Sequence, residues 1–199
     1  MAEAVFDAQP LPVGSKEYNA TGWLGALSLI AAEGSLFVYL LFSFAYFAVQ
    51  HGKAWLPEAH PSLKFSLPGT VILVASSGVV WWSERSLKRG NRVQHLVALA
   101  GTIALGIVFL VIQGFEWKAK HFTLASSAYG SLFFTITGFH MLHVIVGVLM
   151  LSVVFAWSLA GFFSPRRHLH VTISSAYWHF VDVVWLAVFF TFYIAPYCW

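Results

Sequence analysis

The stretch TGFHMLHVIVG, residues 137–147, places His140 and His143 among Phe, Met, Leu, Val, Ile and Gly. It lies inside an apolar run over residues 128–160, which is long enough for a helix to cross about 30 Å of hydrocarbon. Polar side chains are costly in such a segment and are seldom without a role. The two imidazoles therefore predict a transmembrane helix whose polar residues meet partners on other helices.

The whole chain has the composition of a membrane protein. Apolar residues make up 59% of its 199 residues and charged residues only 10%, against about a quarter charged in ordinary soluble domains. Five apolar segments approach or exceed the roughly 20 residues that a spanning helix needs. These segments cover residues near 21–49, 68–84, 93–116, 128–160 and 171–197. The sequence thus predicts an all-α polytopic membrane protein with five transmembrane helices.

The rest of the chain offers little room for another domain. The connections between the predicted spans are short, and residues 1–20 form a polar N-terminal segment unlike a cleaved signal peptide. We therefore expect one five-helix transmembrane domain over residues 21–199. The single cysteine, Cys198, excludes an internal disulfide and a metal site built from cysteines.

Positive residues are unevenly distributed between the two sides of the predicted bundle. One side carries Lys16, Arg85, Lys88, Arg89, Arg92, Arg166 and Arg167, and the other carries Lys53, Lys64, Lys118 and Lys120. The positive-inside rule then predicts a cytoplasmic N-terminus and a C-terminus outside. The same rule explains the net charge of +3 without a nucleic-acid partner.

Five polar residues lie deep inside the predicted spans. They are Glu33 in the first span, His140 and His143 in the fourth, and His179 and Asp182 in the fifth. At about 1.5 Å per residue, all five fall within about two turns of the midplane. A carboxylate that accepts a hydrogen bond from an imidazole makes both groups cheaper to bury. We therefore predict one buried polar network, with His179 paired to Asp182 and Glu33 paired to a histidine of the fourth span.

Three interpretations of this network are open. The first is that it fastens the helices together, with Gly34, Gly138 and Gly147 permitting close approach. The second is a proton-handling or gating role for Glu33, because desolvation disfavours the charged form of an isolated carboxyl. The third is metal or haem ligation by the histidines and the aspartate, without a cysteine or a second cluster to support it. We favour the first interpretation.

Other charged residues are expected at the membrane interfaces. Arg92, Arg166 and Arg167 are predicted to set the topology and to contact anionic lipid headgroups. Glu116, beside Trp117 and Lys118, is predicted to form an ion pair at the interface or to contact protein or lipid there.

Several motifs, taken in order, resemble subunit III of the haem-copper terminal oxidases, which are the cytochrome c and quinol oxidases of respiratory chains. The similarity covers roughly residues 22–197. The motifs are AAEGSLFVYLLFSFAYF (31–47), LPGTVILVASSGVVWWSERSLKRGNR (67–92), IQGFEW (112–117), YGSLFFTITGFHMLHVIVG (129–147) and YWHFVDVVWL (177–186).

The resemblance implies a subunit with no redox centre and no cofactor of its own. Haem and copper are expected in the partner catalytic subunit. Such a subunit packs against oxidase subunit I and other oxidase subunits, contacts membrane phospholipids, supports proton uptake and limits inactivation during turnover. The resemblance also implies that Glu33 matches the family's buried carboxyl on the first shared helix and that Glu116 matches a carboxyl at the outer end of the third helix. His140, His143, His179 and Asp182 match polar positions of the last two helices.

The sequence departs from the mitochondrial type of this family, which has two further N-terminal helices. It is similar to the five-helix bacterial form, so the expected location is the bacterial cytoplasmic membrane. Thr172, Ile173 and Ser174 stand where some members carry an acidic residue. A zinc or headgroup role for that region is therefore not expected here.

Other functions remain open at this point. A related possibility is an accessory subunit of a nitric oxide reductase. A different class is a small membrane b-type cytochrome, with His140 or His143 and His179 as axial ligands. A proton-coupled transporter is disfavoured because the spans show neither an inverted repeat nor broken helices.

Overall fold

The computed structural model describes residues 21–55 and 63–197, and these residues are almost entirely helical. The long helices are α1 (Thr21–His51), α2 (Leu63–Lys88), α3 (Arg92–Lys118), α4 (Ala128–Leu159) and α5 (Leu169–Phe189). A short 3₁₀ turn, η1 (Gly52–Trp55), follows α1, and α5 continues as a π-helical turn, η2 (Phe190–Ile194), and a 3₁₀ turn, η3 (Ala195–Tyr197). Five helices are long and apolar enough to cross a membrane. The predicted all-α polytopic fold is confirmed.

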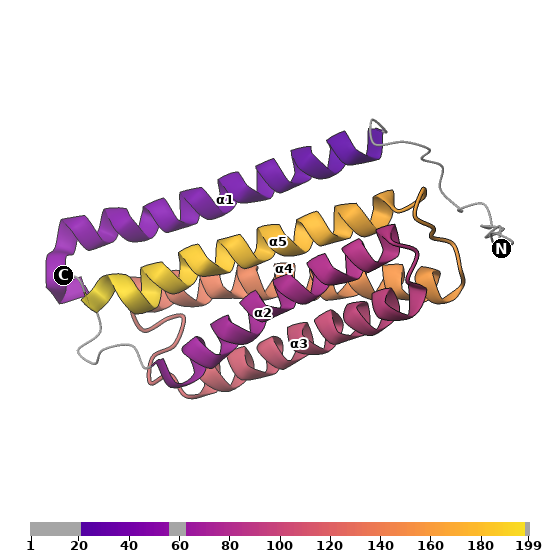
Figure 1. Ribbon diagram of the computed structural model, residues 1–199. Helices are drawn as coiled ribbons and strands as arrows, with labels where there is room; N and C mark the ends of the chain where they lie inside the picture. The colour runs from indigo at the N-terminus through magenta and orange to yellow at the C-terminus, as the bar shows by residue number, and fades with distance from the viewer. Residues whose placement is uncertain (1–20, 56–62, 198–199) are drawn as a thin grey trace, which may run out of the picture.

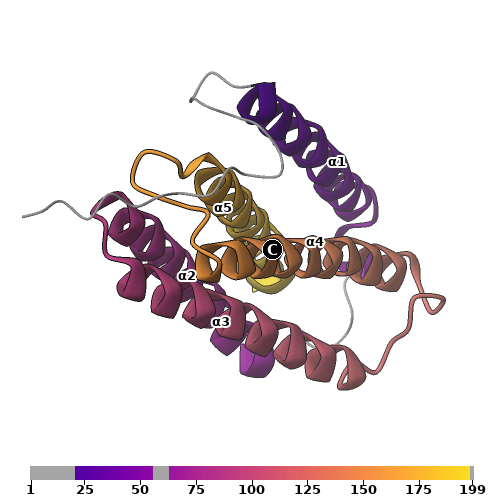
Figure 2. The same cartoon turned by 90° about the vertical axis from the view of Figure 1, so that its right-hand side faces the viewer.

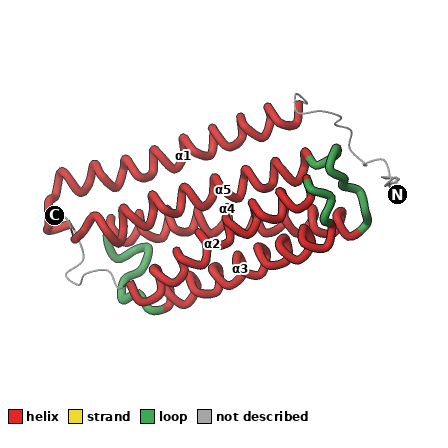
Figure 3. Tube along the Cα trace, viewed as in Figure 1, coloured by secondary structure: helices red, strands yellow, loops and turns green. Residues whose placement is uncertain are grey.

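Consecutive helices run antiparallel, so that α1, α3 and α5 all finish at the end of the bundle opposite to that of α2 and α4 (Figure 1). Loops gather at these two ends (Figure 3). Helix α5 lies inside the bundle. Half of the residues in its most apolar 18-residue stretch are buried, whereas only 6% are buried in the corresponding stretch of α1. Helix α1 lies along the outside and contacts α5 and α4 (Figure 2).

The predicted spans agree with the helices except in the second. The first, third and fourth spans begin and end within two residues of α1, α3 and α4. Helix α2, predicted over 68–84, extends from Leu63 to Lys88. Pro68 lies early in the helix, where its missing N–H removes one hydrogen bond without ending the helix. The polar residues at both ends of α2 continue the helix beyond its apolar part.

Helices α2 and α4 end in the same backbone motif. Gly90 and Gly161 have positive φ angles of 79° and 83°. The N–H of Asn91 bonds to the Ser86 carbonyl at 2.9 Å, and the N–H of Phe162 bonds to the Trp157 carbonyl at 3.1 Å. This Schellman arrangement satisfies carbonyls at a helix end and favours glycine. The Asn91 side chain then accepts from the Gln94 N–H at the start of α3, which makes the α2–α3 turn short.

Trp178 lies where α5 packs against α2, α3 and α4. A Cβ atom added at Gly106 of α3 would lie 2.6 Å from the Trp178 ring, and one added at Gly147 of α4 would lie 2.8 Å from it. The indole N–H donates to Ser76 Oγ of α2 at 2.9 Å. The predicted close approach thus occurs at Gly147, and Gly106 adds a second one.

The other two glycines that were expected to permit close approach make ordinary contacts. A Cβ at Gly34 would lie 3.5 Å from Phe180, and one at Gly138 would lie 3.4 Å from Trp117.

Candidate functional site

The first polar cluster joins α1 to α4 through Glu33 and His143. Glu33 Oε2 lies 3.1 Å from His143 Nε2, and His143 Nδ1 lies 2.7 Å from the carbonyl oxygen of Phe139. A carbonyl only accepts, so Nδ1 carries a hydrogen. A hydrogen bond at Nε2 then requires one more proton, either on the carboxyl or on the imidazole. The two side chains therefore share a proton, and the pair is neutral in either arrangement.

This pair lies at the most open part of the bundle. The Glu33 side chain is 35% exposed and that of His143 is 10% exposed. Phe37, one turn along α1 from Glu33, packs edge-on against the His143 ring with 5.0 Å between centroids. Glu33 therefore combines a deep position along its helix with a side chain that is reachable from the surface of the chain.

The second polar cluster joins α2 to α5 through Ser77, His179 and Asp182. The Ser77 hydroxyl donates to Asp182 Oδ2, and Ser77 Oγ lies 2.8 Å from His179 Nδ1. Because the only hydroxyl hydrogen goes to the carboxylate, His179 Nδ1–H donates to the serine. The expected imidazole–carboxylate contact within α5 is thus replaced by a serine of α2 that bridges the two side chains.

His140 belongs to neither cluster. It is fully buried, and its Nε2 donates to the Val181 carbonyl of α5 at 3.1 Å. Its ring packs against Trp185, with 4.8 Å between centroids. The prediction of one network was therefore wrong: the polar residues of the spans form three separate connections, α1–α4, α4–α5 and α2–α5. Similar depth brought them to one level, but their directions around the helices keep them apart.

Glu116 is buried at the end of α3, with 2% of its surface exposed. It accepts a hydrogen bond from the Tyr193 hydroxyl at 2.5 Å and forms an ion pair with Lys120 at 3.0 Å. The ion pair that was predicted beside Lys118 therefore forms one helical turn further along. The Tyr193 hydrogen bond to Glu116 joins α3 to η2, the π-helical continuation of α5.

The three arginines that were expected at the membrane interface have different surroundings. Arg92 Nη2 donates to the carbonyls of Ser158 and Leu159 at 3.2 and 2.7 Å, so it caps the end of α4, where carbonyls lack helical partners. Arg166 is exposed in the loop before α5. Arg167 closes a turn in the same loop through its backbone, which pairs with Ser164.

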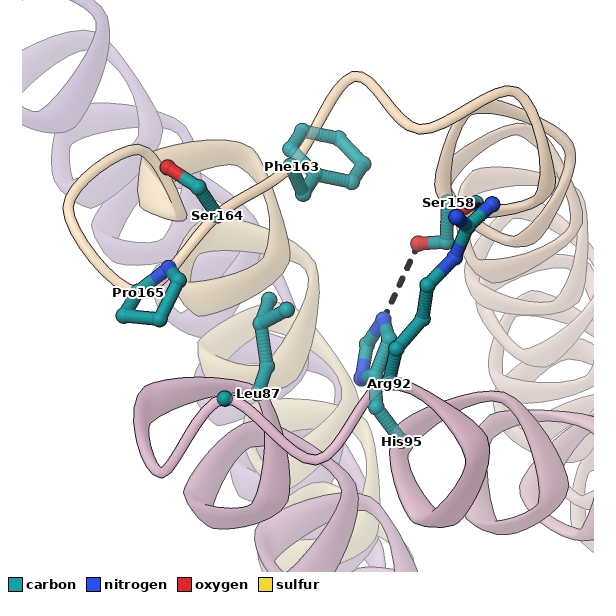
Figure 4. Close-up of a pocket in the computed structure, with 8 residues that line it drawn as sticks. Leu87, Arg92, His95, Ser158, Phe163, Ser164 and Pro165 are labelled. Carbon is teal, nitrogen blue, oxygen red and sulfur yellow. Dashed lines mark hydrogen bonds between the residues drawn. The ribbon is translucent and has the colours of Figure 1, made fainter. Parts of the chain in front are cut away.

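A further polar site, around His95, was not among the predicted residues. His95 is fully buried; its Nδ1 donates to the Ser83 carbonyl at 3.1 Å, and its Nε2 lies 2.9 Å from Ser158 Oγ. A cavity of about 20 Å³ lies beside it, which is the size of one water molecule. Figure 4 shows His95 and Arg92 at this cavity, with the hydrogen bond to Ser158 dashed.

Serines explain why sequence reasoning missed two of these sites. Ser77, Ser83 and Ser158 each meet a histidine, but serines are common in apolar helices and often bond only to their own backbone. A single buried histidine such as His95 was a usable signal. The serines that contact His95 and His179 could not be recognised, because nothing in their spacing along the sequence distinguishes them from other serines.

The histidines of the membrane interior are all engaged by groups on other helices. Their partners are a carbonyl, hydroxyls and a carboxyl. Within residues 21–55 and 63–197, no three His, Cys, Asp or Glu side chains are placed to hold a metal ion together. The arrangement is suited to joining helices.

Comparison with known proteins identifies the family. The family model described as Cytochrome c oxidase subunit III matches residues 15–197. The chain is 43% identical over 145 residues to cytochrome c oxidase subunit 3 of Lemur catta, covering 71% of this chain and 53% of the relative. It is 38% identical over 176 residues to that of Drosophila melanogaster (85% and 67%) and 36% identical over 182 residues to that of Pisaster ochraceus (88% and 68%).

The chain thus spans about half of the lemur protein and about two thirds of the other two. The match runs through all five membrane helices and through the segments that carry both polar clusters. This chain belongs to the cytochrome c oxidase subunit III family.

Proposed function

We propose that this chain is the non-redox subunit III of a respiratory haem-copper oxidase. In this role it packs against oxidase subunit I, the catalytic subunit that carries haem and copper, and against other oxidase subunits and membrane phospholipids. The observation that carries the proposal is membership of the family, together with interior histidines that are occupied in joining helices.

The subunit's proposed contribution is to stabilise the catalytic subunit and to support its proton uptake and sustained oxygen reduction. His140, His179 and Asp182 serve as fasteners within the bundle. Glu33 and His143 serve proton handling, because the hydrogen between Oε2 and Nε2 can move from one partner to the other without changing the net charge of the pair. The partial exposure of Glu33 supports this assignment.

The proposed location is the bacterial cytoplasmic membrane, with the N-terminus in the cytoplasm and the C-terminus outside. The excess of Arg and Lys at the end where α2 and α4 finish supports this orientation. Arg166 and Arg167, in the loop at that end, are proposed to contact anionic headgroups.

Purification of the tagged full chain from its native membrane tests this function. The expected result is co-purification with a haem-copper catalytic subunit, identified by mass spectrometry, and a reduced spectrum of a- or o-type haem. Co-purification with b-type haem and non-haem iron would instead assign the chain to a nitric oxide reductase. A Soret band from the isolated chain would assign it to the cytochromes.

A further inference from the structure

The outward face of α2 carries an ordered stripe of exposed residues. Val71, Val74, Gly78, Trp81 and Arg85 follow one another at spacings of three and four, which places them on one side of the helix. Val71, Val74 and Trp81 are 61%, 44% and 53% exposed. The stripe passes from aliphatic to aromatic to cationic side chains toward the end of the helix.

Gly78 makes a notch in this stripe. A Cβ atom added there would meet nothing within 4 Å, so the backbone is uncovered between Val74 and Trp81. A linear alkyl chain can approach a helix most closely where a side chain is missing. The apolar part of the stripe therefore offers a surface along which an acyl chain can lie.

An open pocket of about 370 Å³ lies at the cationic end of the stripe, lined by Trp81, Glu84, Arg85, Lys88 and Arg89. The Arg85 guanidinium lies over the Trp81 ring, 5.1 Å from its centroid. Aromatic stacking of this kind holds a guanidinium in place while leaving its N–H groups free to donate.

The charges in this pocket are not balanced within the described chain. Glu84 accepts from Lys88 at 2.6 Å and from the Thr172 hydroxyl at 2.9 Å. Neither Arg85 nor Arg89 forms an ion pair with a carboxylate of residues 21–55 or 63–197. Because Lys88 neutralises Glu84, the pocket presents two uncompensated guanidinium groups to an anion.

The length of α2 sets the depth of the pocket in the membrane. Its 26 residues extend about 39 Å, which exceeds the hydrocarbon thickness of about 30 Å. The last turns, which hold Arg85 and Arg89, therefore reach the headgroup layer, while Val71 and Val74 lie at the level of the acyl chains. Trp81 lies between them, at the level that tryptophan prefers.

We propose that this face of α2 binds one acidic glycerophospholipid. Its phosphodiester accepts hydrogen bonds from Arg85 and Arg89, and one acyl chain lies along Val71, Val74 and the notch at Gly78. The order of groups along the helix matches the order of groups in the lipid, and forked guanidinium donors suit phosphate oxygens. This site does not depend on the proposed function of the subunit.

Lipid binding to the full chain in its detergent-purified, delipidated complex tests the proposal. Phosphatidylglycerol and phosphatidylcholine are added separately, and bound lipid is measured by native mass spectrometry. Wild type should bind one phosphatidylglycerol tightly and phosphatidylcholine weakly. The double variant R85Q/R89Q should lose affinity for phosphatidylglycerol by about 25-fold, the effect of two headgroup-level cations. The charge-matched control K64Q/K118Q, at exposed positions at the opposite end of the bundle, should bind as wild type does.

A second variant tests the acyl-chain contact and leaves Arg85 and Arg89 unchanged. Gly78→Leu fills the notch at an exposed position where an added Cβ meets nothing within 4 Å, so we expect the bundle to keep its stability. It should weaken binding of long-chain phosphatidylglycerol and leave a dihexanoyl analogue unaffected. Equal binding by wild type and R85Q/R89Q, or equal binding of the two headgroups, would overturn the proposal. A photo-crosslink from position 81 to another polypeptide instead of lipid would also overturn it, in favour of a subunit interface.

Discussion

Glu33 of α1 and His143 of α4 lie 3.1 Å apart, Oε2 to Nε2. The bond joins the least buried helix to the rest of the bundle. This contact thus connects α1 to α4, and we propose that it also serves proton handling. These two roles can be separated by substitution.

Glu33→Gln separates packing from protonation. The amide preserves the shape of the side chain and can donate to His143 Nε2, but it cannot ionise. We expect the complex to assemble and reduce oxygen, with fewer turnovers before inactivation or a lower proton yield. Ser35→Ala, which removes only a bond to the Ala32 carbonyl on the same helix, is the control. Wild-type turnover lifetime together with wild-type proton yield in Glu33→Gln would leave Glu33 a structural contact.

A hydrophobic carbodiimide should label Glu33 in preference to Glu84 and Glu116. These reagents need a protonated carboxyl that they can reach from lipid, and the Glu33 side chain is 35% exposed. Glu84 and Glu116 are held in ion pairs by lysines, with 14% and 3% of their side chains exposed. Peptide mapping measures the label. Glu3, Glu17 and Glu58, for which weak labelling is also expected, lie outside the described residues. Label found mainly on another residue would contradict the shared-proton arrangement.

Asp182→Ala should harm assembly more than any single change in the connections, such as Arg166→Gln. Removing the carboxylate leaves the Ser77 hydroxyl, which also accepts from His179, without its own acceptor, at a cost of about 1–3 kcal/mol. Thermal unfolding of the purified complex measures the loss.

Ser77→Ala tests the bridge between the same residues. We expect it to destabilise the complex as well, and the double variant Ser77→Ala/Asp182→Ala to lose less than the sum of the two single losses. A neutral Ser77→Ala would show that His179 and Asp182 contact each other without the serine.

Gly106→Ala and Gly147→Ala should each destabilise the bundle. A methyl group at either position would lie within 3 Å of the Trp178 ring, and overpacking of this kind costs about 1–3 kcal/mol. Gly114→Ala is the matched control, because nothing lies within 4 Å of its added Cβ and alanine favours the helix. The melting temperatures of the three variants test this prediction. If Gly106→Ala and Gly147→Ala melt at the same temperature as Gly114→Ala, the Trp178 ring can move aside.

The purified subunit, freed from its partners, should bind neither haem nor a metal ion stoichiometrically. His140 Nε2 donates to a carbonyl, and His143 and His179 each have a partner on another helix. His140 Nδ1 has no hydrogen-bond partner but is buried, and no three His, Cys, Asp or Glu side chains of residues 21–55 and 63–197 converge on a metal position. Metal analysis and an absorption spectrum of the isolated chain are the measurements. One tightly held ion per chain, or a Soret band, would contradict the expectation.

The limits of α1, α3 and α4 could be predicted closely, whereas the fifth predicted span, 171–197, runs through α5 into η2 and η3. The polar turns of α2 around Pro68 and Lys88 lie outside its apolar core, so a search for apolar runs shortens this helix. Lys120 is four residues from Glu116, a spacing that helix geometry favours. The sequence nevertheless directed attention to Lys118, which is nearer along the chain, whereas Lys120 lies two residues beyond the end of α3.

The sequence by itself determined the number of spans and the depth of their polar residues. Both follow from local properties: the length of an apolar run, and a rise of about 1.5 Å per residue. Only the tertiary structure decided which polar residues meet, because a partner depends on the rotation of each helix and on the order in which helices pack. Those choices placed Glu33 against His143, directed His140 to the Val181 carbonyl, and brought Ser77 between His179 and Asp182.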